Sequence, residues 1–97
     1  MEFLVPWHAE SKDLFVEELK REMAPGHVLS GVPVSALACR QDCDDVLFGL
    51  DDGSNRVAVV HLTWVKESNP AWPATELFSS LEEWSEAMRS DHLDFTS

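Results

Sequence analysis

Basic residues are scarce in this sequence. Only 7 of its 97 residues are Lys or Arg, against 18 Asp and Glu, which gives a formal net charge of −11. A protein that binds nucleic acid by neutralising phosphates needs a Lys and Arg footprint, so we expect no nucleic-acid partner. The excess of acid suits a basic protein partner, but it is also typical of a surface that only keeps a small protein in solution.

Cysteines and long apolar runs are also scarce. Cys39 and Cys43 are the only cysteines, too few for a disulfide scaffold. The N-terminal segment from Met1 to Pro6 has no basic region and only a short apolar run, so it does not predict a secretory signal. No apolar run approaches the ~20 residues that span a bilayer. We therefore expect a cytoplasmic protein that does not enter membranes and keeps both thiols free.

The apolar content is sufficient for one core. Hydrophobic residues make up 44% of the chain, with four Trp and five Phe but no Tyr. This composition is typical of a folded globular protein rather than a disordered one. The length corresponds to one domain, so we predict a single domain over residues 1–97.

The longest β-prone run extends from Arg56 to Trp64. Successive side chains of a strand face opposite sides, and here one face is wholly apolar while the other is half apolar. The apolar face carries Ala58, Val60, Leu62 and Trp64, and the other face carries Val57, Val59, His61 and Thr63. A strand that is apolar on both faces usually lies inside its sheet, so we predict this run as the central strand.

Helix periodicity and turn signals divide the rest of the chain. We predict a helix over about 11–23 with Ser11 as its N-cap, ended by Pro25 and Gly26. Strands over 34–39 and 46–50 precede the central strand, and residues 75–78 after it form either a short fourth strand of the sheet or an irregular segment. Ser80 and Glu83 form a capping box for a second helix over about 81–90. This order predicts an α+β fold, in which a three- to four-stranded antiparallel meander packs with an N-terminal and a C-terminal helix.

A zinc site is the first chemistry to weigh. Cys39 and Cys43 are spaced C-x₃-C, but every candidate for a second ligand pair is an isolated histidine. The segment His8-Ala9-Glu10 resembles half of the zinc-deaminase signature, whose other half, P-C-x-x-C, is absent. We therefore expect no metal and no other cofactor. If a metal did bind, Cys39, Cys43 and His61 are the candidate ligands.

A thiol–imidazole pair is the second chemistry to weigh. His61 with Cys39 or Cys43 would suit nucleophilic catalysis, because an imidazole helps to form the thiolate. The sequence shows neither an orienting third residue nor an oxyanion signature, so a non-enzymatic protein is favoured and Cys39 and His61 stay the catalytic candidates. Five aspartates bracket the second strand and suit either weak cation binding or solvated turns. They are Asp42, Asp44, Asp45, Asp51 and Asp52.

Tryptophans and acids supply the candidate binding surface. Trp64 and Trp84 lie on regular apolar faces, which predicts that both belong to the core. Trp7 and Trp72 neighbour prolines outside regular structure, so they either mark an interface or cap the edges of the core. The second helix carries an acidic outer face formed by Glu82, Glu83 and Glu86. We take Trp7, Trp72 and this acidic face as the candidate binding surface.

An ordered set of short segments gives the chain a recognisable pattern. The segments are Val59-Val60-His61-Leu62-Thr63-Trp64, Trp72-Pro73, Thr75-Glu76-Leu77-Phe78, Leu81-Glu82-Glu83-Trp84 and Asp91-His92. The pattern resembles a group of small, uncharacterised bacterial proteins of about this length, and it covers roughly residues 31–95. The resemblance implies a complete small bacterial protein but brings no activity, cofactor or site residue with it.

Two functions remain open at this point. The first is a small acidic, non-enzymatic protein that binds another protein, as a monomer or a homodimer; its size and charge are similar to those of acidic α+β immunity proteins that neutralise toxins. The alternative is a small enzyme or metal-binding protein centred on His61 with Cys39, Cys43 or nearby aspartates. The first predicts an exposed aromatic patch rimmed by acids, and the second predicts His61 within hydrogen-bond reach of a thiol or carboxylate inside a cleft.

Overall fold

The computed structural model describes residues 2–96, which form five strands and two helices. The strands are β1 (Trp7–Ala9), β2 (Val34–Arg40), β3 (Asp45–Leu50), β4 (Val57–His61) and β5 (Thr75–Phe78), and the helices are α1 (Asp13–Glu22) and α2 (Leu81–Thr96). All neighbouring strands are antiparallel, and their order in the sheet, β1-β2-β3-β4-β5, is their order in the chain. None of the helices in the described residues has the length and apolar character needed to cross a membrane.

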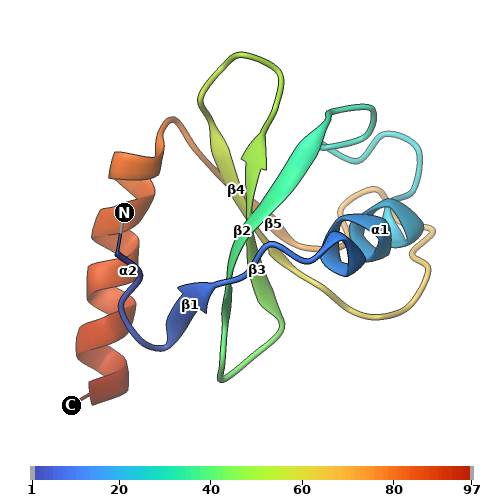
Figure 1. Cartoon of the computed structure of the whole chain (residues 1–97). Coiled ribbons are helices and arrows are strands. Elements are labelled where there is room, and N and C mark those ends of the chain that lie inside the picture. Colours follow the sequence, from blue (N-terminus) through green and yellow to red (C-terminus); the bar gives the residue numbers. More distant parts are fainter. Residues whose placement is uncertain (1, 97) are drawn as a thin grey trace.

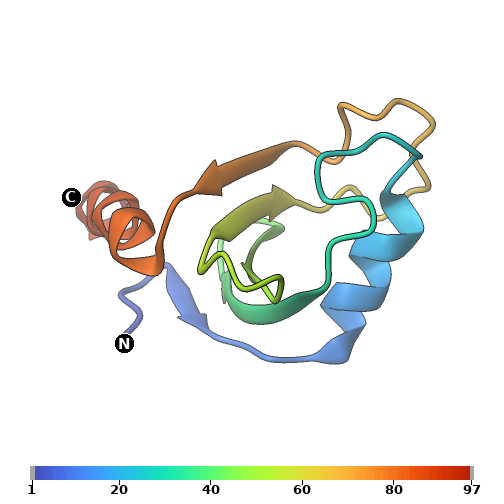
Figure 2. The same cartoon turned by 90° about the horizontal axis from the view of Figure 1, so that it is seen from above.

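The sheet is a middle layer with a helix on each side (Figure 1). Alternation along the strands explains this arrangement, because β2, β3 and β4 each direct apolar side chains to both faces. On β4, Ala58 and Val60 join one core cluster with Leu19 of α1, whereas Val57 joins a second cluster with Trp84 of α2. Figure 2 shows that the sheet is strongly curved and that both of its edges, β1 and β5, approach α2.

The predicted α+β class, the antiparallel meander and the two helices are confirmed, but the sheet has one strand more than expected. The additional strand is β1, in which Trp7 pairs with Arg40 and Ala9 pairs with Ala38. Three residues are too few to show a period-2 pattern, so only the pairing with β2 reveals the strand. β4 lies inside the sheet as predicted, although β3 is the middle strand of the five.

The helix ends differ from the prediction in two places. Ser11 is not the N-cap of α1, because the helix begins at Asp13 after Lys12, whose side chain makes no capping hydrogen bond. α2 begins at the predicted capping residue, since the Glu83 N–H donates to Ser80 Oγ at 3.1 Å. It continues past residue 90 to Thr96, and His92 contributes to this extension because its Nδ1 lies 2.7 Å from the carbonyl oxygen of Val5.

A β-bulge changes the two faces of β2 part-way along the strand. The register with β3 shifts between Ala36 and Ala38, so Leu37 is an additional residue. In a regular strand Ala36 and Ala38 would share a face, but Ala36 belongs to the core beside α1 and Ala38 to the core beside α2. As a result, Cys39 packs against the core beside α1.

Candidate functional site

Polar and reactive side chains gather at the end of the sheet where β2 ends, β3 begins and β4 ends. Asp45 is the first residue of β3 and His61 is the last residue of β4, and the two are directly paired. A pocket of about 80 Å³ lies at this end of the molecule. Its walls include Phe15, Cys39, Cys43, Asp44, Asp45 and Trp64.

The sequence predicts that Trp64 belongs to the core, and this prediction is wrong. β4 ends at His61, and the backbone of Trp64 has a φ of 60°, in the left-handed region that bulky residues rarely adopt. This turn leaves the side chain 42% exposed at the rim of the pocket instead of continuing the apolar face of β4.

A buried carboxylate holds this turn in place. Glu22, the last residue of α1, is 0% exposed. Its Oε1 accepts the backbone N–H of Thr63 at 2.8 Å and the Thr63 hydroxyl at 2.9 Å, and its Oε2 accepts the backbone N–H of Trp64 at 2.8 Å. The signal for Glu22 in the sequence is its spacing from Phe15 and Leu19, which places this acidic residue on the inward face of the helix.

The charge of Glu22 is disfavoured despite these three donors. Burial raises the pKa of Glu22, and the neighbouring Glu18 raises it further. Glu18 shows the opposite effect, because Arg21 forms two hydrogen bonds with its carboxylate, at 3.0 and 2.7 Å, and lowers the pKa of Glu18. Negative charge is therefore stabilised on Glu18 and disfavoured on Glu22.

His61 contacts a carboxylate and not Cys39. Its Nδ1 lies 2.7 Å from Asp45 Oδ1, and the two side chains are 51% and 23% exposed. Cys39 of β2 pairs with Val46 of β3, so a whole strand separates Cys39 from His61. The candidate Cys39–His61 pair therefore does not form.

The two cysteines lie in different polar groups, so Cys39 and Cys43 do not act together as a C-x₃-C ligand pair. Cys39 groups with His8 and Glu10, whereas Cys43 groups with Asp45 and His61; within each group the nitrogen, oxygen and sulfur donor atoms lie within 4.8 Å of one another. Burial raises the pKa of both Cys39 and Cys43. These shifts are opposite to the lowered pKa that is typical of a nucleophilic cysteine.

Trp7 is buried, so its predicted place on an exposed binding surface is wrong. It is 2% exposed and packs edge-on against Trp84, with ring centroids 5.1 Å apart. Its Nε1–H donates to Asp91 at 3.0 Å, and the guanidinium of Arg40 lies 5.9 Å from its ring centroid. Pairing of β1 with β2 directs Trp7 into the core beside α2, which the prolines near it in the sequence did not indicate.

The other residues of the predicted binding surface are exposed. Trp72 is 45% exposed, and Glu82, Glu83 and Glu86 all lie on the outer side of α2. Comparisons with known proteins add no assignment to these residues: no protein-family model, no curated protein and no solved structure matches the chain. The geometry of the site is therefore what indicates a function.

Proposed function

We propose that this protein binds a basic segment of another protein, and that a Lys or Arg side chain of the partner enters the pocket beside Trp64. The indole would contact the cationic head group, and the carboxylates of Asp44 and Asp45 would supply the opposite charge. All three residues line the same pocket. The proposal keeps the basic protein partner expected from the composition and moves the aromatic contact from Trp7 to Trp64.

The observation that supports this function is the strained, exposed conformation of Trp64. A bulky residue at positive φ costs of order 1–3 kcal/mol and persists only where its surroundings hold it. Here the fully buried carboxyl group of Glu22 holds it, through the backbone N–H groups of Thr63 and Trp64. Such strain is concentrated at ligand-binding positions, which supports a role for the exposed indole in recognition.

The size and charge of the pocket support a single cationic side chain as the ligand. A volume of about 80 Å³ is well below the roughly 300–1,000 Å³ of sites for small-molecule ligands. Arg40 also lines the pocket, but Asp42 forms two hydrogen bonds with its guanidinium, both at 2.8 Å, and compensates its charge. The net charge of −11 would in addition steer basic partners toward the protein.

The test is the binding of fluorescently labelled Lys- and Arg-rich peptides to the full chain, measured by anisotropy at several salt concentrations. We expect binding that weakens as salt is added, because salt screens exposed charges. Trp64→Ala should weaken binding by about tenfold, since a cation over an indole contributes ~0.5–2 kcal/mol. Trp72→Ala is the matched control, because Trp72 is exposed to a similar degree, 45% against 42%.

Three outcomes would contradict the proposal. They are the absence of peptide binding at low salt, undiminished binding by Trp64→Ala, and an equal loss in Trp64→Ala and Trp72→Ala. The last outcome would assign the effect to a general loss of aromatic surface rather than to the pocket. A folded far-UV spectrum of both variants ensures that the comparison concerns binding.

A further inference from the structure

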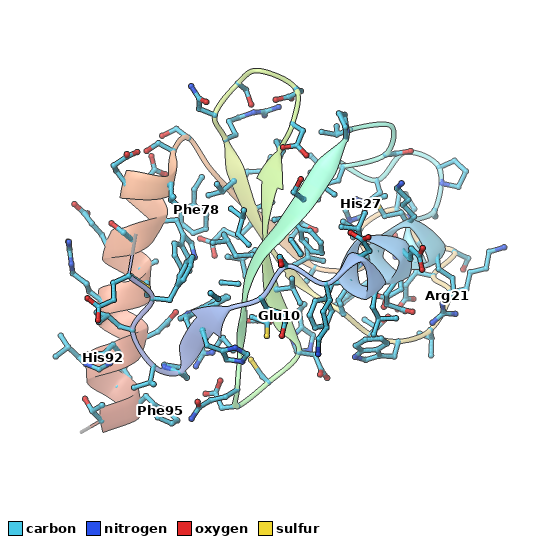
Figure 3. All side chains as sticks on the ribbon, in the orientation of Figure 1. Glu10, Arg21, His27, Phe78, His92 and Phe95 are labelled. Carbon is cyan, nitrogen blue, oxygen red and sulfur yellow. The ribbon has the colours of Figure 1, made fainter. Side chains whose placement is uncertain are left out.

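Three metal-ligating side chains meet on one side of the β1–β2 pair, and one of them, Cys39, also lines the pocket beside Trp64. His8 of β1 lies directly opposite Cys39 of β2, and Glu10 follows two positions after His8. Figure 3 shows Glu10 on the segment that joins β1 to α1. We propose that His8, Glu10 and Cys39 together bind one divalent transition-metal ion of the zinc class, with water in the fourth position. This site goes beyond the proposed function and does not depend on it.

The distances suit such an ion. Bond lengths of about 2.0–2.3 Å in a tetrahedral zinc site place neighbouring donor atoms roughly 3.5 Å apart. His8 Nε2 lies 3.3 Å from Cys39 Sγ, and the donor atoms of all three residues lie within 4.8 Å of one another. The Glu10 N–H also donates to the Leu37 carbonyl at 3.1 Å, so the β1–β2 pairing extends to Glu10 and fixes its backbone.

The bulge at Leu37 is what brings the sulfur to this side. Without the additional residue, Cys39 would face the core beside α2, together with Trp7. With the additional residue, Cys39 packs against the core beside α1, and its thiol faces His8. On β1, His8 points to the opposite face from its neighbours Trp7 and Ala9. Ligands held by paired strands keep their geometry better than ligands on loops do.

The chemistry of the donors selects the class of metal. Thiolate and imidazole ligands favour zinc, cobalt, nickel and copper, whereas magnesium and calcium prefer oxygen ligands alone. On binding, the Cys39 S–H bond breaks, a sulfur–metal bond forms, and the proton passes to the solvent. Lys12, 3.8 Å from Glu10, has a 65% exposed side chain that can turn into water when the carboxylate binds the ion.

A bound ion would also balance the charges that the three ligands bring together. A divalent ion compensates both the Glu10 carboxylate and the Cys39 thiolate that forms on binding. Cys39 and Glu10 are both partly buried, which strengthens their attraction for the ion relative to a fully solvated pair.

The second group, Cys43 with Asp45 and His61, is a weaker candidate. Asp45 and His61 already form a contact of 2.7 Å, closer than the roughly 3.5 Å that a shared tetrahedral ion requires. An ion would therefore have to separate two groups that attract each other. The sequence predicted no metal because it shows no second ligand pair and no P-C-x-x-C segment; the pairing of β1 with β2 instead brings the Cys39 thiol to His8 and Glu10.

The experiment is a titration of the reduced, metal-free full chain with Co²⁺, followed by absorption, and then displacement of cobalt by Zn²⁺. We expect one equivalent of cobalt with a thiolate-to-metal charge-transfer band that depends on Cys39. Cys39→Ser should remove this band, and His8→Ala should weaken binding by more than about 100-fold, since loss of even an outer-shell partner costs 10–100-fold. Cys43→Ser is the matched control. It should still bind one equivalent of cobalt with the charge-transfer band that depends on Cys39.

The outcomes separate the alternatives. Loss of the band in Cys43→Ser and its retention in Cys39→Ser would place the metal at the second group and overturn the proposal. Binding that is equal in all variants, or no saturable binding, would also overturn it. If Cys39→Ser failed to fold, His8→Ala would still decide the question, because His8 is exposed. Addition of Zn²⁺ should further raise the melting temperature of the unmodified chain but not that of His8→Ala.

Discussion

The backbone N–H of Trp64 donates to Glu22 Oε2 at 2.8 Å, across 42 positions of sequence. This bond joins the last turn of α1 to the turn that follows β4. It connects the fully buried side chain of Glu22 to the backbone of Trp64, a residue that is 42% exposed. The shape of the exposed surface beside Trp64 therefore depends on a carboxyl group inside the protein.

Replacement of Glu22 by Ala should lower the free energy of unfolding by about 2–5 kcal/mol. The change would leave the N–H groups of Thr63 and Trp64 without their acceptor, and each unsatisfied buried donor costs ~1–3 kcal/mol. Urea unfolding followed by tryptophan fluorescence measures the difference. Glu17→Ala, an exposed position on the same helix, is the control and should change stability by no more than ~0.5 kcal/mol. Similar losses in the two variants would refute this role of Glu22.

Glu22 should also make stability decrease as pH rises above the ordinary glutamate value of about 4.3. Because the pKa of Glu22 is raised in the folded state, the folded protein retains a proton that the unfolded chain has released, so a rise in pH favours unfolding. Glu18, whose pKa is lowered, has the opposite effect. Its contribution to the free energy of unfolding is lost only as pH falls below the ordinary glutamate pKa. Unfolding free energies from pH 4 to 8 for the unmodified chain and for Glu22→Gln should show the downward slope only in the former. Parallel pH profiles of the unmodified chain and Glu22→Gln would exclude this effect of Glu22.

Glycine at position 64 should be tolerated better than alanine. Both substitutions remove the indole, but the φ of 60° disfavours any residue with a Cβ, whereas glycine adopts it freely. Trp64→Gly should therefore be more stable than Trp64→Ala by ~1 kcal/mol, measured by urea unfolding. If Trp64→Ala were as stable as Trp64→Gly, the left-handed turn would not be a constraint on the protein.

His27 should be important for stability rather than for binding. Its side chain is 4% exposed; its Nδ1 accepts the Leu29 N–H at 3.0 Å, so the proton lies on Nε2, which donates to the Pro73 carbonyl at 2.9 Å. His27→Ala should lower the unfolding free energy by about 1–3 kcal/mol, because it leaves the buried Leu29 N–H without its acceptor and the Pro73 carbonyl with only the Thr75 hydroxyl. His61→Ala, at an exposed contact with Asp45, should cost less than ~1 kcal/mol in the same urea unfolding. A larger loss for His61→Ala than for His27→Ala would contradict this assignment.

Period-2 patterns and turn residues were sufficient to predict β3 and β4, which direct apolar side chains to both cores, and β2 despite its bulge. They indicated β5 only as an optional fourth strand, since Phe78 packs against one core while Leu77 is exposed. They did not reveal β1, which is three residues long and exists through its pairing with β2. The same limitation explains Trp7. Its burial follows from that pairing, whereas the sequence shows only a tryptophan beside a proline.

The candidate sites were predicted less completely than the fold. The positions of Asp45 and His61 at facing strand ends follow from the meander, but the partner of Cys39 does not, because the bulge at Leu37 reverses the facing of the residues after it. Trp64 was misplaced because alternation was extended beyond His61, where Glu22 bends the chain. Both errors arise where one additional residue or one distant carboxyl group interrupts a regular pattern.

The short outer strands of the sheet bear on aggregation. β1 has three residues and β5 has four, so each edge offers few unpaired N–H and C=O groups to another molecule. β5 also carries the exposed acid Glu76, and a negatively charged edge repels a copy of itself. The longer and more apolar strands, β2, β3 and β4, are enclosed between these edges. The strands most prone to aggregation thus lie away from neighbouring copies at high concentration, in a chain with nine Trp and Phe residues.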